Sequence, residues 1–302
     1  MKNKKPLIIC AIIALCAGIL LLCMAGRGQK HSHAIIATNF VGYDFARAIT
    51  GDKSEVKMLL KPGAEMHDYE PTPQDIIDIT NAEFFIYVGG ESEKWVADIL
   101  RDNNIDEGKT IRMMDFVDLK KEDGEEDEYD EHIWTSPVNA IRIIEAIRDR
   151  FIAKRPGELD KYTDNAAKYT AKLKTLDTDI REIVDGAKRK TLVFADRFPF
   201  RYFVDEYGLD YLAAFPGCAE QTEASSSTIA ELVNKIKSEN IPIVLKMELT
   251  SDSLAWTVSD ETGARILMLD SAHNISQEDY DAGITYADIW EDNLDVLWEA
   301  LN

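Results

Sequence analysis

Short apolar runs alternate with amphipathic segments along most of the chain. Each run is bounded by polar or turn residues, as buried strands are, whereas the segments between them repeat apolar residues every three or four positions, as helices with one buried face do. The expected strands are 34–38, 55–60, 84–88, 191–194, 211–214, 243–245 and 266–269. The expected helices are 41–49, 73–80, 94–100, 137–151, 201–207, 227–238, 252–259 and 286–301. Strands that alternate with helices predict an α/β fold with mainly parallel sheets flanked by helices.

One segment, 158–185, has apolar residues spaced alternately three and four apart, the pattern of a single continuous amphipathic helix. At ~1.5 Å per residue it would span ~42 Å, longer than a crossover between neighbouring strands requires. A coiled-coil dimer would use the same pattern. Strand–helix alternation resumes after this segment, which favours a long backbone helix that bridges two lobes, each a mainly parallel sheet flanked by helices.

The N-terminus has the layout of an export signal. Three lysines precede an uncharged apolar run from Pro6 to Met24, which predicts a secretory leader or a retained anchor. Cys23 sits at the depth of an acylated lipoprotein cysteine, but no small residue precedes it, so lipid attachment, a plain anchor and ordinary cleavage stay open. We therefore expect four parts: signal or anchor with spacer at 1–33, an N-terminal metal-binding lobe at 34–157, a linking helix at 158–188 and a C-terminal lobe at 189–302.

The chain is strongly acidic, with a formal net charge of −21. Such a surface repels phosphate backbones, so nucleic acid is not an expected partner, and it concentrates cations. Eight of the ten residues 122–131 are carboxylates. A run of like charges this dense predicts a mobile, solvating loop, or one that gathers cations beside a metal site.

Three histidines lie in loops between an expected strand and an expected helix or at the end of a strand. His67 follows the strand 55–60, His132 precedes the helix that opens with Pro137, and His273 follows the strand 266–269. Neutral imidazole is a common ligand of zinc and of other first-row divalent ions. Together with Asp270, these histidines form a predicted metal-binding set of three nitrogens and one oxygen.

Two motifs carry a resemblance to a known family. Residues 62–73, PGAEMHDYEPTP, and residues 130–137, DEHIWTSP, resemble the N-lobe metal motifs of the zinc and manganese solute-binding proteins of ABC importers. Similar landmarks follow at 202–209, at 261–264 and near Tyr286 and Asn293. The resemblance implies a metal held between two lobes for delivery to a membrane permease, with His67 and His132 as N-lobe ligands and Asp270 as the C-lobe carboxylate.

One departure from the family pattern puts the remaining ligand in doubt. About ten residues before Tyr207-Gly208-Leu209, where zinc-binding relatives have a histidine, this chain has Arg197 and its neighbours. Arginine stays protonated and cannot replace that ligand. The alternatives for the missing donor are His273, Asp196, Glu223 and water, of which we favour His273. Cys218 is interpreted as a small buried thiol rather than a ligand for a soft metal.

The predicted function is that of an extracytoplasmic receptor, attached to the cell membrane or periplasmic, that binds zinc and feeds an ABC permease. We expect it to act as a monomer and not as an enzyme. Manganese is the alternative metal, since added carboxylates shift preference toward it. A secreted metallohydrolase would use the same ligands to activate water, but no HExxH, GxSxG or phosphate-binding glycine motif is present. A metal-dependent adhesin is the third alternative.

Overall fold

The computed structural model describes residues 33–122, 128–217 and 224–302. The predicted leader with Cys23, the centre of the acidic run, Cys218 and Glu223 lie outside the described residues. Among the described residues, no helix combines the length and the apolar character needed to cross a membrane.

The N-terminal half contains a parallel sheet of four strands in the order β2-β1-β3-β4. Its strands are β1 (Ile35–Ala37), β2 (Val56–Met58), β3 (Phe84–Tyr87) and β4 (Thr110–Arg112). Its helices are α2 (Phe40–Thr50), α3 (Pro73–Asn81), α4 (Lys94–Asp102) and α5 (Pro137–Lys154). The central strand β1 pairs Ile35 with Val56 on one side and with Phe84 on the other. A central strand buried on both faces requires apolar residues at every position, as in Ile35, Ile36 and Ala37.

The C-terminal half repeats this plan, with the strand order β6-β5-β7-β8. Its strands are β5 (Thr191–Phe194), β6 (Asp210–Ala213), β7 (Ile243–Lys246) and β8 (Arg265–Met268). Its helices are α7 (Arg201–Tyr207), α8 (Ser226–Glu239), α9 (Ser253–Thr262), α10 (Gln277–Ala282) and α11 (Tyr286–Leu301). The described 3-10 turns all lie earlier in the chain, before residue 159. They are η1 (Lys53–Glu55), η2 (Glu91–Glu93), η3 (Glu107–Lys109), η4 (Met113–Phe116), η5 (Ile133–Thr135) and η6 (Pro156–Glu158). All neighbouring strands in both sheets are parallel, which confirms the predicted fold class.

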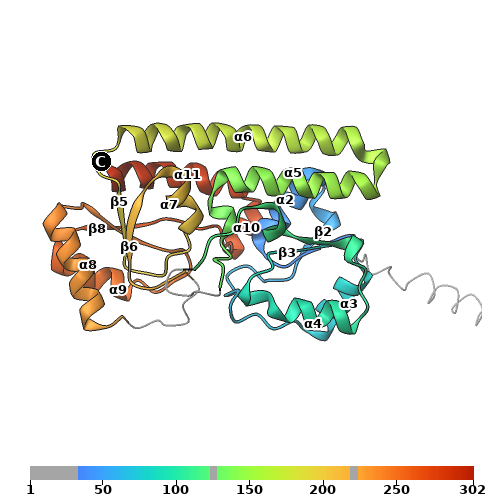
Figure 1. The fold of residues 1–302 in the computed structure, drawn as a ribbon, viewed down its shortest axis with the longest axis horizontal. Coiled ribbons are helices and arrows are strands. Elements are labelled where there is room, and N and C mark those ends of the chain that lie inside the picture. The colour runs from blue at the N-terminus through green and yellow to red at the C-terminus, as the bar shows by residue number, and fades with distance from the viewer. Residues whose placement is uncertain (1–32, 123–127, 218–223) are drawn as a thin grey trace, which may run out of the picture. The chain divides into compact units, whose positions relative to one another are not determined.

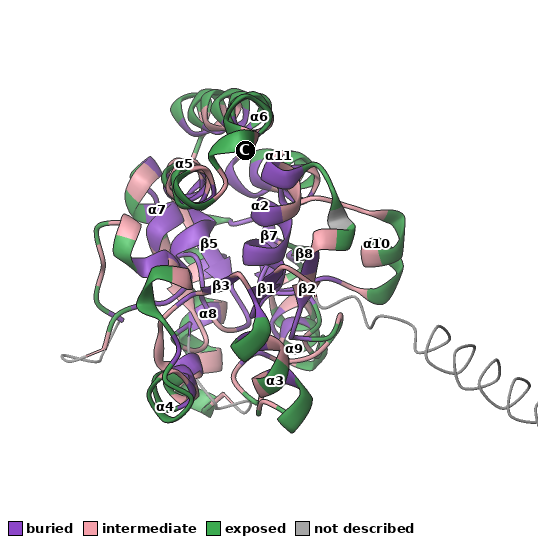
Figure 2. Ribbon diagram, turned by 90° about the vertical axis from the view of Figure 1, so that its right-hand side faces the viewer, coloured by how far each residue is buried: buried purple, intermediate pink, exposed green. Residues whose placement is uncertain are grey.

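The long amphipathic segment forms the single helix α6 (Leu159–Gly186). It packs against α2 and α5 of the first half and against α11 of the second. Figure 1 shows α5 and α11 lying along it. Its buried residues are Tyr162, Ala166, Tyr169, Thr170, Leu173, Leu176, Ile180 and Val184. The apolar stripe is therefore covered within the chain, and a coiled-coil dimer is not needed to explain it. Figure 2 shows the opposite, outward side of α6 as exposed.

A buried polar cluster joins three of these helices. Asp44 on α2 forms an ion pair with Arg47 (Nε–Oδ1 2.7 Å), and it also accepts hydrogen bonds from the Tyr169 hydroxyl on α6 and from the backbone N–H of Tyr286 on α11 (3.0 Å). The Arg47 guanidinium in turn donates to the carbonyl of Gly283. Burial raises the pKa of Asp44, while Arg47 and the hydrogen bonds from Tyr169 and Tyr286 oppose that rise. This cluster ties the first helix of the N-terminal half to the last helix of the C-terminal half.

The described ends of the acidic run do not form the solvating loop that its charge predicted. Glu122, Asp130 and Glu131 are buried, and Lys121 and Tyr129 form an antiparallel bridge that draws the two ends of the run together. The expectation of a wholly solvent-exposed loop is therefore wrong at these ends. Hydrogen bonds to buried carboxylates offset the free-energy cost of removing them from water. Asp130 and Glu131 directly precede His132, one of the predicted metal ligands.

Candidate metal centre

The three histidines singled out in the sequence come together in the described structure. One ligand atom from each of His67, His132 and His273 lies within 4.8 Å of one from each of the others. The ring centroids are 6.2 Å apart for His67 and His132, 5.5 Å for His67 and His273, and 5.3 Å for His132 and His273. His132 and His273 are buried and His67 is half-buried. Side chains from both halves of the chain therefore converge on one point.

Capping residues fix the loops of the two N-terminal histidines. The Thr72 side chain accepts from the backbone N–H of Asp75, and Pro73 opens α3 just beyond the loop of His67. Ser136 accepts from the backbone N–H of Asn139 in the same way before α5, just after His132. Both histidines therefore precede a helix whose start is set by its own sequence.

A tight turn after β8 places the third histidine. Ala272 adopts the left-handed backbone conformation with φ 56°, which is uncommon for a residue other than glycine. The Asp270 carboxylate accepts from the Ala272 N–H (2.8 Å), and the Glu248 carboxylate accepts from Ser271 N (2.9 Å) and His273 N (3.3 Å). These carboxylates hold the turn in the conformation that points His273 toward the other two rings.

Asp270, the fourth residue of the predicted set, is not part of the group of described residues whose ligand atoms converge. Its backbone N–H donates to Asn293 Oδ1 (3.0 Å), and its carbonyl accepts from Asn293 Nδ2 (2.7 Å). Burial and the nearby Glu248 charge raise the pKa of Asp270. In this structure its carboxylate shapes the backbone that carries His273.

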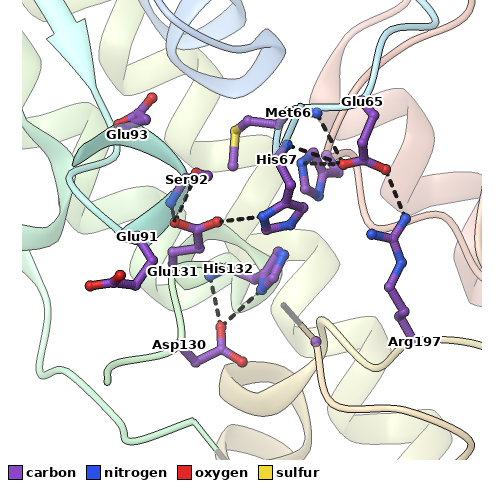
Figure 3. A network of polar contacts seen from close by, with 12 residues as sticks. Glu65, Met66, His67, Glu91, Ser92, Glu93, Asp130, Glu131, His132 and Arg197 are labelled. Carbon is purple, nitrogen blue, oxygen red and sulfur yellow. Dashed lines mark hydrogen bonds and ion pairs between the residues drawn. The ribbon is translucent and has the colours of Figure 1, made fainter. Parts of the chain in front are cut away.

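Carboxylates orient two of the imidazole rings (Figure 3). Asp130 Oδ1 lies 3.1 Å from His132 Nδ1 and accepts from His132 N (2.7 Å), while Glu131 Oε1 lies 3.6 Å from His67 Nδ1. Glu131 itself accepts from the backbone N–H (3.2 Å) and hydroxyl (2.9 Å) of Ser92. With Nδ1 directed at a carboxylate, each ring presents Nε2 to the space between the histidines. A carboxylate on the second nitrogen fixes the ring and increases its basicity as a metal ligand.

Burial favours the neutral, metal-binding form of two of the imidazoles, those of His67 and His273. It lowers the pKa of His67 to about 4, with a further contribution from His132. The pKa of His273 is lowered well below its usual value, first by burial and then by His132 and His67. Neutral imidazole has a free lone pair for a cation. The Nε2 atoms of His67 and His273 are buried and have no hydrogen-bond partner among the described residues, so a metal ion would satisfy both.

Trp134 closes one side of the site. Its ring packs edge-on against His132 (5.6 Å between centroids) and against His273 (5.9 Å). The indole N–H donates to the carbonyl of Ser271 (2.9 Å), and the Tyr286 hydroxyl donates to the Trp134 carbonyl (2.6 Å). A buried aromatic wall excludes water and strengthens the electrostatic interactions inside the site.

Arg197 lies beside the histidines and binds the carboxylate of Glu65, which was not among the predicted site residues. Its Nη2 donates to Glu65 Oε2 (2.8 Å), and Glu65 Oε1 lies 3.9 Å from His273 Nε2. Burial alone would raise the pKa of Glu65, but Arg197 and the nearby histidines bring it to about 2. Asp196, the neighbouring candidate donor, instead accepts from Met247 N (3.0 Å). Three carboxylates of the site could have been suspected from sequence only because each lies within two residues of a candidate ligand. They are Glu65, Asp130 and Glu131.

We expect Asp130→Asn to weaken the binding of a divalent transition metal at this site by about 10- to 100-fold, the usual cost of removing the carboxylate that orients a ligating histidine. The asparagine retains the side-chain volume but loses the negative charge facing His132 Nδ1. Titration of metal-stripped protein measures the change. Asp118→Asn is the matched control, because Asp118 is fully exposed and pairs only loosely with Arg142 (3.6 Å). Equal affinities in the two variants would contradict an orienting role for Asp130.

The chain matches a known protein family over nearly all of its length. The family model described as "Zinc-uptake complex component A periplasmic" matches residues 35–300. The zinc-binding lipoprotein AdcA of Streptococcus pneumoniae R6 is 32% identical over 298 residues, a match that covers 95% of this chain and 59% of that protein. The chain thus spans well under two thirds of the length of AdcA.

Two further relatives match over most of their length. The high-affinity zinc uptake system protein ZnuA of Bacillus subtilis is 29% identical over 279 residues, covering 88% of this chain and 87% of that protein. The Zn(II)-bound ZnuA-like domain of Streptococcus pneumoniae AdcA superimposes with a TM-score of 0.77 at 32% identity, covering 88% of this chain and 98% of that domain.

Proposed function

Because the chain belongs to the zinc-uptake complex component A family, we propose that it captures a divalent transition metal, zinc in preference to manganese, for import. The observation that carries this proposal is the convergence of His67, His132 and His273 from the two halves of the chain. Three imidazole nitrogen donors suit tetrahedral zinc, whereas manganese favours oxygen donors. Family members are receptors of uptake systems rather than enzymes, so the metallohydrolase alternative is set aside.

Delivery to the permease of an ABC importer completes the proposed function. The histidines come from both sheets, so a small separation of the two halves would pull the ligands apart and release the ion. The helix α6 packs along both halves, which favours small tilts over a wide hinge opening. We place the receptor outside the cytoplasm, held at the membrane through its N-terminal segment, where the permease would receive the metal.

Titration calorimetry on metal-stripped protein tests the choice of metal. We expect zinc to bind with a Kd below about 1 μM, equivalent to about −8.2 kcal/mol, and manganese to bind at least about tenfold more weakly, as the order of divalent-metal affinities predicts. Tighter binding of manganese would make the protein a manganese receptor. Absence of measurable binding for both ions would overturn the proposed function.

A further inference from the structure

An ion pair spans the cleft beside the three histidines. Arg197 follows β5 in the C-terminal half, and Glu65 precedes His67 by two residues in the N-terminal half. The 2.8 Å contact between Arg197 Nη2 and Glu65 Oε2 joins the two halves directly (Figure 3), and the side chains are only 19% and 35% exposed. A partly buried pair with this geometry is worth more than an exposed surface ion pair.

Hydrogen bonds between carboxylates and backbone N–H groups hold both partners of this ion pair in place. Glu65 Oε1 accepts from the backbone N–H of Met66 (3.0 Å) and of His67 (3.4 Å), so the carboxylate lies against the backbone of a candidate ligand. On the other side, the Asp196 carboxylate accepts from Arg197 N (2.8 Å) and from Met247 N (3.0 Å), which fixes the start of the Arg197 loop to the end of β7. The ion pair therefore couples the backbone of His67 to the strand ends of the second sheet.

The loop that carries Glu65 is also tied to the segment that carries His273. Gly63 N donates to the carbonyl of Ile275 (2.8 Å), and Asn274 Nδ2 donates to the carbonyl of Lys61 (2.9 Å). Glu65, Arg197 and His273 line a common pocket of about 60 Å³, room for only a few water molecules. The ion pair thus shares this pocket with His273, one of the three candidate ligands.

Electrostatics assigns different roles to the two charges. The Arg197 guanidinium lies near His67 and His273 and would repel a divalent cation bound to them. Such repulsion is strong in a partly buried site. Glu65 cancels that charge, with Oε1 only 3.9 Å from His273 Nε2. The Glu65 carboxylate nevertheless does not belong to the group whose ligand atoms lie within 4.8 Å of one another, so the geometry gives it the position of a counter-charge rather than that of a ligand.

We propose that Glu65 and Arg197 form a charge clasp across the cleft, in which Glu65 neutralises Arg197 beside the cation and the pair holds the His67 loop against the C-terminal half. Both are positioning residues, and the metal keeps three imidazoles with a fourth position open. The inference rests on the proposed metal-binding function and adds to it the means by which this chain accommodates an arginine next to its site.

A double-mutant cycle on the intact protein tests the clasp, with zinc affinity measured for wild type, Glu65→Gln, Arg197→Gln and the double variant. Glutamine at position 65 retains the oxygen that accepts from Met66 and His67. We expect Glu65→Gln alone to weaken zinc binding about tenfold or more, since it leaves Arg197 uncompensated. Arg197→Gln should stay within about threefold of wild type, and the double variant should recover most of the loss. The visible absorption of bound Co²⁺, which reports the donor set, should be the same in all four proteins.

The control is Glu206→Gln, which removes one carboxylate from an ion pair with Arg181 (2.6 Å) on α6. It should bind zinc like wild type. A double variant as weak as Glu65→Gln, with an altered Co²⁺ spectrum, would make Glu65 a metal ligand and overturn the clasp. Equal affinities in all four proteins would also overturn it. Wild-type protein that binds no zinc would instead overturn the proposed function, and the clasp with it.

Discussion

Replacing His67 or His132 with alanine is expected to weaken zinc binding by at least about 100-fold, equivalent to about 2.8 kcal/mol. Each variant leaves two imidazoles where a stable zinc site needs three or four protein donors. The Nδ1 atoms of both rings face carboxylates, at 3.6 Å in His67 and 3.1 Å in His132, so each ring is held ready to bind. Calorimetric titration of metal-stripped protein measures the loss.

The matched control for these two variants is His33→Ala. The His33 ring is hydrogen-bonded to the carbonyl of Ser54 (2.9 Å), at an exposed position outside the converging group. Its removal should leave zinc affinity unchanged. His273→Ala belongs in the same series, because it tests whether the C-terminal half supplies an imidazole. Undiminished affinity in both His67→Ala and His132→Ala would rule out the proposed site.

The second large effect is expected from Asp44→Ala, which should lower the free energy of unfolding by about 3–5 kcal/mol. The change leaves the guanidinium of Arg47, whose side chain is only 10% exposed, without its carboxylate partner. It also removes the acceptor of the Tyr169 hydroxyl and of the Tyr286 N–H. Breaking one partner of a buried ion pair costs more than the pair contributes, since an uncompensated charge stays behind.

Urea unfolding of metal-free protein measures this effect without the stabilisation that a bound ion would add. The control is Asp98→Ala, which removes one of the two carboxylate partners of Arg101, in an ion pair whose two side chains are both 67% exposed. Exposed pairs of this kind contribute at most about 1 kcal/mol. A similar loss of stability in the two variants would show that the Asp44 cluster does not hold the helices together.

Local sequence accounts for most of the secondary structure. The Thr72–Pro73 and Ser136–Pro137 pairs predicted two helix starts, and the structure confirms both with a capping hydrogen bond. The family match confirms the resemblance that the histidine motifs carried. Capping and amphipathic spacing act over a few residues, so they can be recognised without knowing the fold.

The strand β4 and the helix α10, which were not predicted, have weak local sequence signals. The strand β4 has the sequence Thr-Ile-Arg, with a single buried side chain at Ile111, so it has no apolar run to recognise. The helix α10 has six residues and no fully buried side chain. Pairing with β3 stabilises β4, and a serine cap with the packing around the turn stabilises α10, so tertiary context decides both.

The sequence by itself determined the class of fold, the long helix α6, and which residue types were available to bind a cation. It also showed that Arg197 occupies a position where a ligand was expected. Only the tertiary structure decided that His273 joins His67 and His132, that Asp270 instead supports the turn before His273, and that Glu65 compensates Arg197. The physical reason is distance along the chain. Periodicity and capping are local, whereas donor convergence and charge compensation depend on residues more than 60 positions apart that only folding brings within a few ångströms of one another.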